Sequence, residues 1–405
     1  MMRKAISLAA LLLAGGANAQ LFVDGATVVM DGEPQRMDVN IGADGTATME
    51  AELVAEDGAE TITGGWVTPG LFVPYSHVGL VDIGLEASTN DTRAGDAKTS
   101  VANRAADAFN PKAVAVANSR VEGVAYLATV PGSSGNVFDG TGSVVSTSGE
   151  FDSVVVEDAF IVANLGESSK GVAGGTRSAA MAQLREALND AQRVGAGSDP
   201  DFGNVLTPRD ARQLRRALSG DIPLVVTANR AADILRVIDL GEDYPGLDLI
   251  VLGASEAWQV ADRLADAGLK VMIDPHDNLP STFESVGARA DNALLLNAAG
   301  VQFAFTTATA DLTHNVRVVA QHAGNAVGEG LPWSKAFAAI STTPAEWFGV
   351  EADSLVVWSG DPLEVTSYPV AMFIDGERVP LRSRQTALRD RYNPLSTDER
   401  AHKYR

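Results

Sequence analysis

The middle of the chain, from residue 67 to residue 350, alternates short apolar runs with stretches in which apolar residues recur at helical spacing. Each apolar run is bounded by polar or glycine residues, which is typical of a buried strand. The runs that predict strands occupy residues 71–73, 121–130, 222–228, 247–253, 269–274 and 301–307. A repeated strand–helix order predicts an α/β protein built from parallel βα units. Over this length it favours a (β/α)8 TIM-like barrel over an open doubly wound sheet.

Two helices between these strands have clear signals of their own. Apolar residues recur at helical spacing from Met181 to Ala191, which predicts an amphipathic helix over residues 177–194. Thr207-Pro208 supplies an N-cap and a proline at the first helical position, so a second helix is expected to run to Ala217. No glycine fingerprint of the dinucleotide-binding type follows any predicted strand, which excludes a Rossmann-type nucleotide site.

The two ends of the chain have a different pattern, with short β segments and no helical periodicity. Residues 20–66 contain Asp31-Gly32, a strong signal for a two-residue hairpin turn. A matching piece lies at residues 351–384. We expect the two pieces to pair into one satellite sheet, as a small composite β-sandwich domain beside the barrel of residues 67–350. The charged residues 385–405, which include His402, are expected to form a solvated tail.

Composition excludes several classes of function. Hydrophobic residues make up 45% and charged residues 20% of the 405 residues, which is ordinary for a globular protein with one large domain and a smaller one. A formal net charge of −21 repels nucleic acid and anionic lipid. The chain has no cysteine, so it can form no disulfide and has no thiolate chemistry.

Residues 1–19 have the features of a secretory signal peptide. Arg3 and Lys4 give a positive start, an apolar stretch follows, and an Ala-x-Ala site ends at Ala19 before Gln20. The apolar stretch is too short to span a bilayer, and without cysteine the chain has no lipobox for lipid attachment. We therefore expect an exported, periplasmic protein with no membrane anchor.

Candidate chemistry is expected at the carboxyl ends of the barrel strands. The first strand ends at Tyr75 and His77, which are two residues apart and so leave the strand on the same face. A later strand ends with Thr227 and Asn229, which have the same spacing. The last predicted strand is followed by Thr307 and Ala308.

The stretch 65–80 closely resembles the first-strand signature of the amidohydrolase superfamily, an Asp-x-His-x-His run that supplies two zinc ligands. Val73, Tyr75 and His77 occupy those three positions, so only the last histidine is kept. The resemblance continues in order through the segments 222–235, 249–258, 274–280, 292–296, 303–308, 313–317, 342–350 and 354–379. It covers nearly the whole mature chain and is most similar to the imidazolonepropionase-related branch.

The resemblance implies a metal-dependent hydrolase of non-peptide or dipeptide-like C–N bonds, with two histidines at the positions of Thr227 and Asn229 and a ligand and general-base aspartate at Thr307 or Ala308. A hydrolytic zinc needs about three imidazole or carboxylate ligands and an open position. Hydroxyl and amide groups are poor substitutes. We therefore expect no metal or cofactor, and a degenerate, non-catalytic binding or assembly subunit. Its expected partners are a small molecule at the barrel mouth and a second subunit, as a homodimer or with an active paralogue.

An alternative stays open, in which an active amidohydrolase acts on cyclic amides or related C–N bonds through a rebuilt zinc site. Its candidate ligands are His77, Asp274, His276 and His314, which all fall near predicted strand ends. Against this site, Pro275 favours a turn, in which these polar side chains would bridge loops. His322, inside a predicted helix, is expected to be a packing or surface residue.

Overall fold

The computed structural model describes residues 19–30, 32–194, 205–308, 311–351 and 353–392. The predicted signal peptide, apart from Ala19, and His402 lie outside these residues. The charged C-terminal segment differs from its prediction where it is described, because α10 (Arg384–Tyr392) is a helix, although all its residues are at least partly exposed. Its start is capped by Ser383, whose hydroxyl accepts the Thr386 N–H at 3.3 Å.

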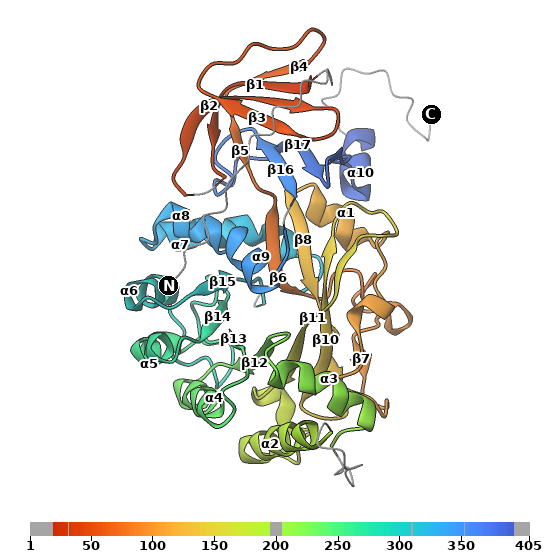
Figure 1. Ribbon diagram of the computed structural model, residues 1–405, viewed down its shortest axis with the longest axis vertical. Coiled ribbons are helices and arrows are strands. Elements are labelled where there is room, and N and C mark those ends of the chain that lie inside the picture. The colour runs from red at the N-terminus through yellow and green to blue at the C-terminus, as the bar shows by residue number, and fades with distance from the viewer. Residues whose placement is uncertain (1–18, 31, 195–204, 309–310, 352, 393–405) are drawn as a thin grey trace.

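The body of the molecule is the predicted barrel (Figure 1). Eight strands form one sheet in the order β15-β14-β13-β12-β11-β10-β8-β6, and all pairs are parallel except the two that β10 makes. Their bounds are β6 Leu71–Ser76, β8 Val124–Thr129, β10 Phe138–Ser146, β11 Val154–Asn164, β12 Leu224–Ala228, β13 Leu249–Gly253, β14 Lys270–Ile273 and β15 Phe303–Phe305. The α/β barrel class is confirmed, with one antiparallel strand as a departure from the ideal pattern.

The sheet closes without a ladder between β15 and β6. Instead, a segment that follows β15 in the chain lies against both strands. The Phe72 N–H donates to Ile340 O at 2.7 Å, and the Phe305 N–H donates to Ala339 O at 2.9 Å. Just after the carboxyl end of β6, the His77 N–H donates to Leu312 O at 2.7 Å. The barrel is thus nearly closed, and its seam is filled by non-strand backbone.

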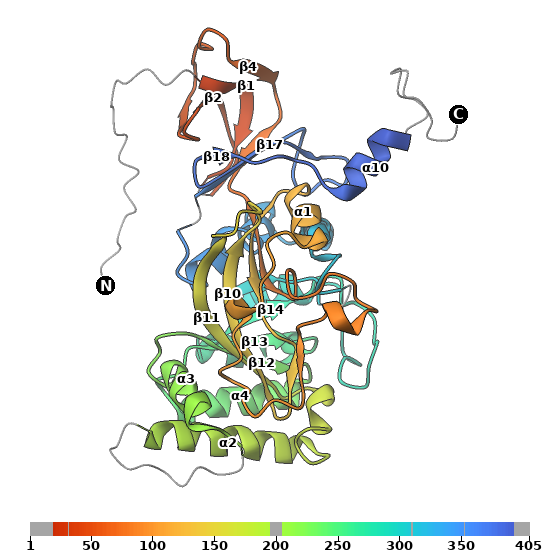
Figure 2. The ribbon, with the colours of Figure 1, turned by 90° about the vertical axis from the view of Figure 1, so that its right-hand side faces the viewer.

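Helices cover the outside of the barrel where the strands are parallel (Figures 1 and 2). The helix predicted over 177–194 is α2, and the one opened by Thr207 is α3, where a capping box with Asp210 forms. Both lie between β11 and β12. The helices are α1 Val114–Arg120, α2 Arg177–Arg193, α3 Pro208–Leu218, α4 Ala231–Asp243, α5 Ala261–Asp266, α6 Asn292–Ala299, α7 Val319–Gly328, α8 Trp333–Ala338 and α9 Thr342–Trp347.

The segments from the two ends of the chain form one eight-stranded sheet rather than two packed sheets. The N-terminal and C-terminal parts join where β5 pairs antiparallel with β16. Alternate residues of both parts, among them Val23, Ile41 and Phe373, bury into a second core of their own. The strands are β1 Ala19–Val28, β2 Gln35–Gly42, β3 Ala47–Glu50, β4 Glu60–Thr63, β5 Trp66–Thr68, β16 Ser354–Trp358, β17 Pro369–Ile374 and β18 Glu377–Arg378.

The hairpin between β1 and β2 is present, but its turn is longer than predicted. The last strand pair is Val28 with Gln35, so the connection is longer than the two residues Asp31-Gly32. Pro34 immediately precedes the second strand and has no N–H to donate to a ladder, which explains why pairing stops there. Asp31 itself lies outside the described residues.

Specific contacts fix this sheet to the base of the barrel. The Gly70 N–H, just before β6, donates to Ser354 Oγ at 3.2 Å. The Trp358 ring packs on Gly123, just before β8, where a Cβ would lie 2.2 Å from the ring. The Tyr126 hydroxyl, on β8, donates to Asp353 O at 3.1 Å.

Across the described ranges, none of the helices is both long enough and apolar enough to cross a bilayer.

Candidate functional site at the barrel mouth

The first barrel strand delivers Tyr75 and His77 to the mouth, as predicted. Tyr75 is 5% exposed, and its ring centroid lies 6.0 Å from that of His77. Burial, with a smaller effect from the Asp139 carboxylate, raises the pKa of Tyr75 well above its usual value. Tyr75 therefore stays a neutral phenol, which is a poor metal ligand.

A backbone carbonyl fixes the ring of His77. Its Nδ1 lies 2.7 Å from Val130 O, and because a carbonyl can only accept, Nδ1 carries the proton. Burial lowers the pKa of His77, while the Val130 carbonyl and the nearby Asp311 carboxylate oppose this effect. The ring is therefore neutral near pH 7, with a lone pair on Nε2. Metal-bound histidines commonly donate their other ring N–H to a carbonyl in this way.

Asn229, at the end of β12, has both atoms of its amide engaged. Its Nδ2 donates to Glu284 Oε1 at 3.0 Å, and its Oδ1 accepts the Ser255 hydroxyl at 3.2 Å. Ser255 Oγ also lies 2.5 Å from Asp277 Oδ2. Gly253 has a φ of +92°, and a Cβ there would lie 2.3 Å from Asn229 Oδ1, so glycine is required for this amide to fit.

The other positions implied by the family resemblance carry no imidazole or carboxylate. Thr227 lies within β12, and its side chain is partly buried. Thr307 is buried, and its hydroxyl donates to Asp311 O at 3.3 Å. The Ala308 N–H donates to Thr306 Oγ1 at 3.3 Å. At these three positions the chain uses its polar atoms for local hydrogen bonds or leaves a methyl group.

The four residues of the predicted rebuilt site do not form a metal centre. Within the described ranges, no group of three or more histidine, aspartate or glutamate side chains is placed to hold a metal ion. Asp274 and His276 are neighbours at the end of β14, where Asp274 Oδ1 accepts the His276 N–H at 2.9 Å. His77 lies at the end of β6 and His314 after β15, and neither completes a ligand set with that pair.

His322 was expected to be a packing or surface residue, but the structure places it at this end of the barrel. It lies on the buried face of α7, 5% exposed, and its Nδ1 is 2.7 Å from Asp274 Oδ1. Its ring centroid is 5.2 Å from that of the exposed His276. The available signal was its spacing, because Val319, Ala323 and Ala326 form the apolar face of the same helix.

Glu284 is a second residue that the sequence analysis missed. It lies in the loop between β14 and α6, and its side chain is 10% exposed. Its Oε2 accepts the Glu167 N–H at 2.7 Å and the Arg177 guanidinium at 3.1 Å, while Oε1 accepts the Asn229 amide. No local pattern in the sequence predicts this role of Glu284, because its hydrogen-bond partners lie in three segments that are distant in sequence.

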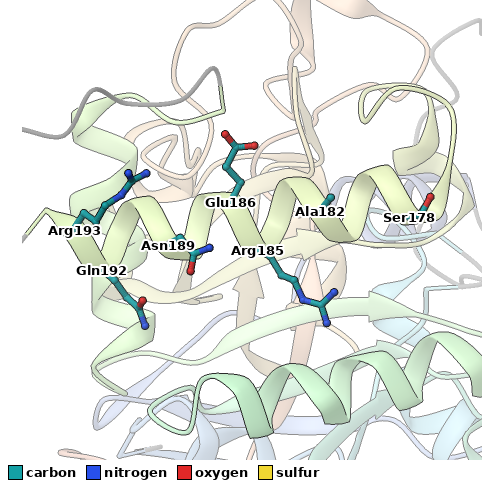
Figure 3. A pocket seen from close by; sticks show the side chains of 7 residues that line it. All are labelled: Ser178, Ala182, Arg185, Glu186, Asn189, Gln192 and Arg193. Carbon is teal, nitrogen blue, oxygen red and sulfur yellow. The ribbon is translucent and has the colours of Figure 1, made fainter.

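A large open groove lies away from the mouth, along the outer side of α2 (Figure 3). It encloses about 700 Å³. Arg185 leaves α2 toward α4, where its guanidinium is 3.7 Å from the Asp243 carboxylate. The lining residues are Ser178, Ala182, Arg185, Glu186, Asn189, Gln192 and Arg193.

The sequence of this chain matches no protein-family model and no curated protein, but its fold matches solved structures. An amidohydrolase from Thermotoga maritima MSB8 superposes with a TM-score of 0.76 at 23% identity, covering 89% of this chain and 100% of that one. The chain has the amidohydrolase fold. A prolidase bound to N-methylphosphonate-L-proline gives a TM-score of 0.52 at 15% identity and coverages of 89% and 99%. Molinate hydrolase gives 0.51 at 14% identity, with 96% of this chain and 98% of that chain covered. At these identities the likeness establishes the fold, and membership of the superfamily and of a branch within it stays a prediction.

Proposed function

We propose that this chain is an exported member of the amidohydrolase superfamily, from its imidazolonepropionase-related branch, that has lost its hydrolytic metal site. In this proposal it acts as a non-catalytic binding or assembly subunit in the periplasm. Its partners would be a small-molecule ligand at the barrel mouth and a second subunit, either another copy or an active paralogue. The fold, the signal-peptide pattern and the family-like segments support this assignment.

The observation that carries the proposal is the hydrogen bonding of Asn229. In the family resemblance this position belongs to a ligand histidine, whose imidazole would face the metal. Here the amide is held between Glu284 and Ser255, with donor and acceptor both used. The nitrogen of a carboxamide only donates, so it cannot replace an imidazole nitrogen as a metal ligand, and the amide oxygen already accepts the Ser255 hydroxyl.

The residues present do not fit a hydrolytic zinc. Of the positions implied by the resemblance, only His77 offers a free imidazole nitrogen, and Tyr75, Thr227, Asn229, Thr307 and Ala308 offer phenol, hydroxyl, amide or methyl groups. One neutral imidazole does not supply the ligand set that zinc needs to lower the pKa of its water.

Metal analysis of the purified protein tests this proposal. We expect protein prepared with zinc present and then desalted to retain well under one zinc per chain. Hydrolysis of cyclic amides, ureides and dipeptides should be unaffected by a chelator. The His77→Ala variant should differ from the parent in stability only. One tightly held zinc per chain, lost in His77→Ala together with chelator-sensitive hydrolysis, would overturn the proposal.

The alternative of an active hydrolase has one favourable observation. Asp274 orients His322, and His322 lies beside His276 at the end of β14, so two imidazoles and a carboxylate are close together. In that case, hydrolysis of a cyclic amide would be lost in His77→Ala and in His276→Ala alike, because both are candidate ligands of the rebuilt site. The same substrate assays decide between the two proposals.

A further inference from the structure

We propose that the barrel mouth contains a carboxylate-binding cradle, which the chain's own Glu284 occupies as a built-in ligand. The cradle would accept a small molecule with a free carboxylate when the loop carrying Glu284 lifts. This inference deepens the proposed function, on which it rests, by naming the class of ligand that a non-catalytic binding subunit of this fold would take.

Three donors from three different elements define the cradle. The backbone N–H of Glu167, in the turn after β11, and the guanidinium of Arg177, on α2, both contact Glu284 Oε2, at 2.7 and 3.1 Å. The side-chain amide of Asn229, after β12, contacts Oε1 at 3.0 Å. Both oxygens of one carboxylate are thus bound, one of them by a charged donor, which is the strongest class of protein hydrogen bond.

The positive charge in the cradle is held in place by a second ion pair. Arg177 Nε lies 3.3 Å from Asp233 Oδ2, and Asp233 also binds Arg230 through both its oxygens at 2.7 Å. Arg177 Nε makes no hydrogen bond, so Asp233, on α4, acts on the guanidinium through charge alone. This attraction is independent of Glu284 and keeps the guanidinium near the cradle if Glu284 leaves.

Gly166 lies close to the bound carboxylate. A Cβ at Gly166 would lie 3.2 Å from Glu284 Oε1 and 3.6 Å from the methyl carbon of Thr227. Thr227 and Asn229 are the two β12 positions where the resemblance places histidines. The cradle therefore occupies part of the region in which the family would hold its metal and substrate.

The loop that carries Glu284 exposes its large apolar side chains and buries its glutamate. Its large apolar side chains point to solvent, with Leu279 73%, Phe283 88% and Val286 62% exposed, while the charged Glu284 is 8% exposed. Apolar burial therefore contributes little to holding this part of the loop against the mouth. Polar contacts hold it instead: the cradle at Glu284 and, three residues on, Gly287, whose N–H donates to Glu256 Oε1 at 3.1 Å and whose carbonyl accepts the Trp258 indole N–H at 2.8 Å. A carboxylate from another molecule could take the three donors of the cradle when Glu284 leaves them.

The test uses the Glu284→Ala variant of the full chain and sodium formate or acetate as the probe. We expect the variant to unfold at a lower temperature than the parent, and about 100 mM acetate or formate to raise its Tm by about 3 °C over the same concentration of sodium chloride. The parent should shift by less than about 1 °C, because its cradle is filled. The double variant Arg177→Met/Glu284→Ala should lose the carboxylate effect.

The matched control is Glu186→Ala, on the solvent-facing side of α2 (Figure 3). It should show no response specific to carboxylate. If Glu284→Ala is recovered only as aggregate, its refolding yield in formate should exceed that in chloride several-fold. Equal effects of chloride and carboxylate, an equal effect on the parent, or a persistent effect without Arg177 would overturn the inference. None of these measurements depends on zinc or hydrolysis, so a failure of the cradle is distinguishable from a failure of the proposed function.

Discussion

The imidazole of His322 and the carboxylate of Asp274 lie 2.7 Å apart, and their side chains are 7% and 2% exposed. The pair joins α7 to the end of β14, beneath the exposed His276. Both groups are removed from water, and Asp274 Oδ1 also accepts the His276 N–H. Loss of the imidazole therefore takes one hydrogen-bond partner away from a buried carboxylate, which costs more than the bond itself contributes.

Replacing His322 with alanine should therefore destabilise the protein strongly. We expect His322→Ala to lower the free energy of unfolding by about 3 kcal/mol, since it leaves the Asp274 carboxylate buried without this partner and removes packing from α7. The measurement is urea unfolding followed by circular dichroism. The control is His276→Ala, whose exposed side chain should cost about 0.5 kcal/mol or less. Equal losses in the two variants would contradict a structural role for the buried pair.

The buried carboxyl of Asp139, on β10, makes the free energy of unfolding depend on pH. Burial raises the pKa of Asp139 from 3.8 to about 8, and a hydrogen bond from Asn164 opposes this only in part. The folded protein therefore keeps a proton that the unfolded chain releases above pH 4, so folding loses stability as the pH rises from about 4 to about 8. Asp139→Asn removes this loss.

The Asp139→Asn variant should be more stable than the parent at pH 9, by an amount on the order of 3 kcal/mol, with a smaller difference at pH 5. Urea unfolding across this pH range provides the measurement. The exposed Asp24 serves as control, because Asp24→Asn removes no buried group and should change stability little. A constant difference for Asp139→Asn would show that its carboxyl is ionised in the folded state.

Gly142 gives a prediction about packing within the barrel. A Cβ at this position would lie 2.2 Å from the Phe160 ring on the neighbouring strand β11. We expect Gly142→Ala to destabilise the protein by about 2 kcal/mol, because both residues are fully buried and the ring has little freedom to move. Gly171→Ala is the control, since a Cβ there meets no atom within 4 Å. Thermal unfolding of the two variants should separate them clearly.

The capping box of α3 gives a fourth prediction. Thr207 Oγ1 accepts the Asp210 N–H at 3.2 Å, and the Asp210 carboxylate accepts the Thr207 N–H at 3.1 Å. Thr207→Ala should lower the free energy of unfolding by about 1 kcal/mol. Arg209→Ala, one position into the helix with an exposed side chain, should have a much smaller effect. Similar losses in both variants would argue that helix propensity, rather than the cap, sets the result.

The parts of the fold that were predictable have a local cause. The helix at 177–194 follows from apolar periodicity, and the start of α3 follows from Thr207-Pro208. The antiparallel strand β10 was missed because Phe138–Ser146 is rich in glycine, serine and threonine and is buried on both faces, so it shows no alternation. Its direction depends on pairing with β8 and β11, which no local pattern encodes.

The candidate site was predictable only in outline. Spacing placed Tyr75 with His77 and Thr227 with Asn229 at strand ends, and the structure has them there. The partner that engages Asn229 is Glu284, which lies in a loop with exposed apolar neighbours and so resembles an ordinary solvated glutamate. Contacts between side chains distant in sequence depend on the complete tertiary fold, and this is why the cradle was not foreseen.

The backbone that fills the seam between β15 and β6 also sets the order in which the barrel can be completed. Phe72 is near the start of the barrel, but the hydrogen bond of its N–H to Ile340 O can form only after all eight strands have been synthesised. Until then both edge strands expose unpaired backbone groups, a state that is open to pairing with other chains. A protein made in this order reaches its closed form only when almost the entire chain has emerged. Truncation shortly before Ile340 would therefore leave an aggregation-prone product rather than a smaller stable domain.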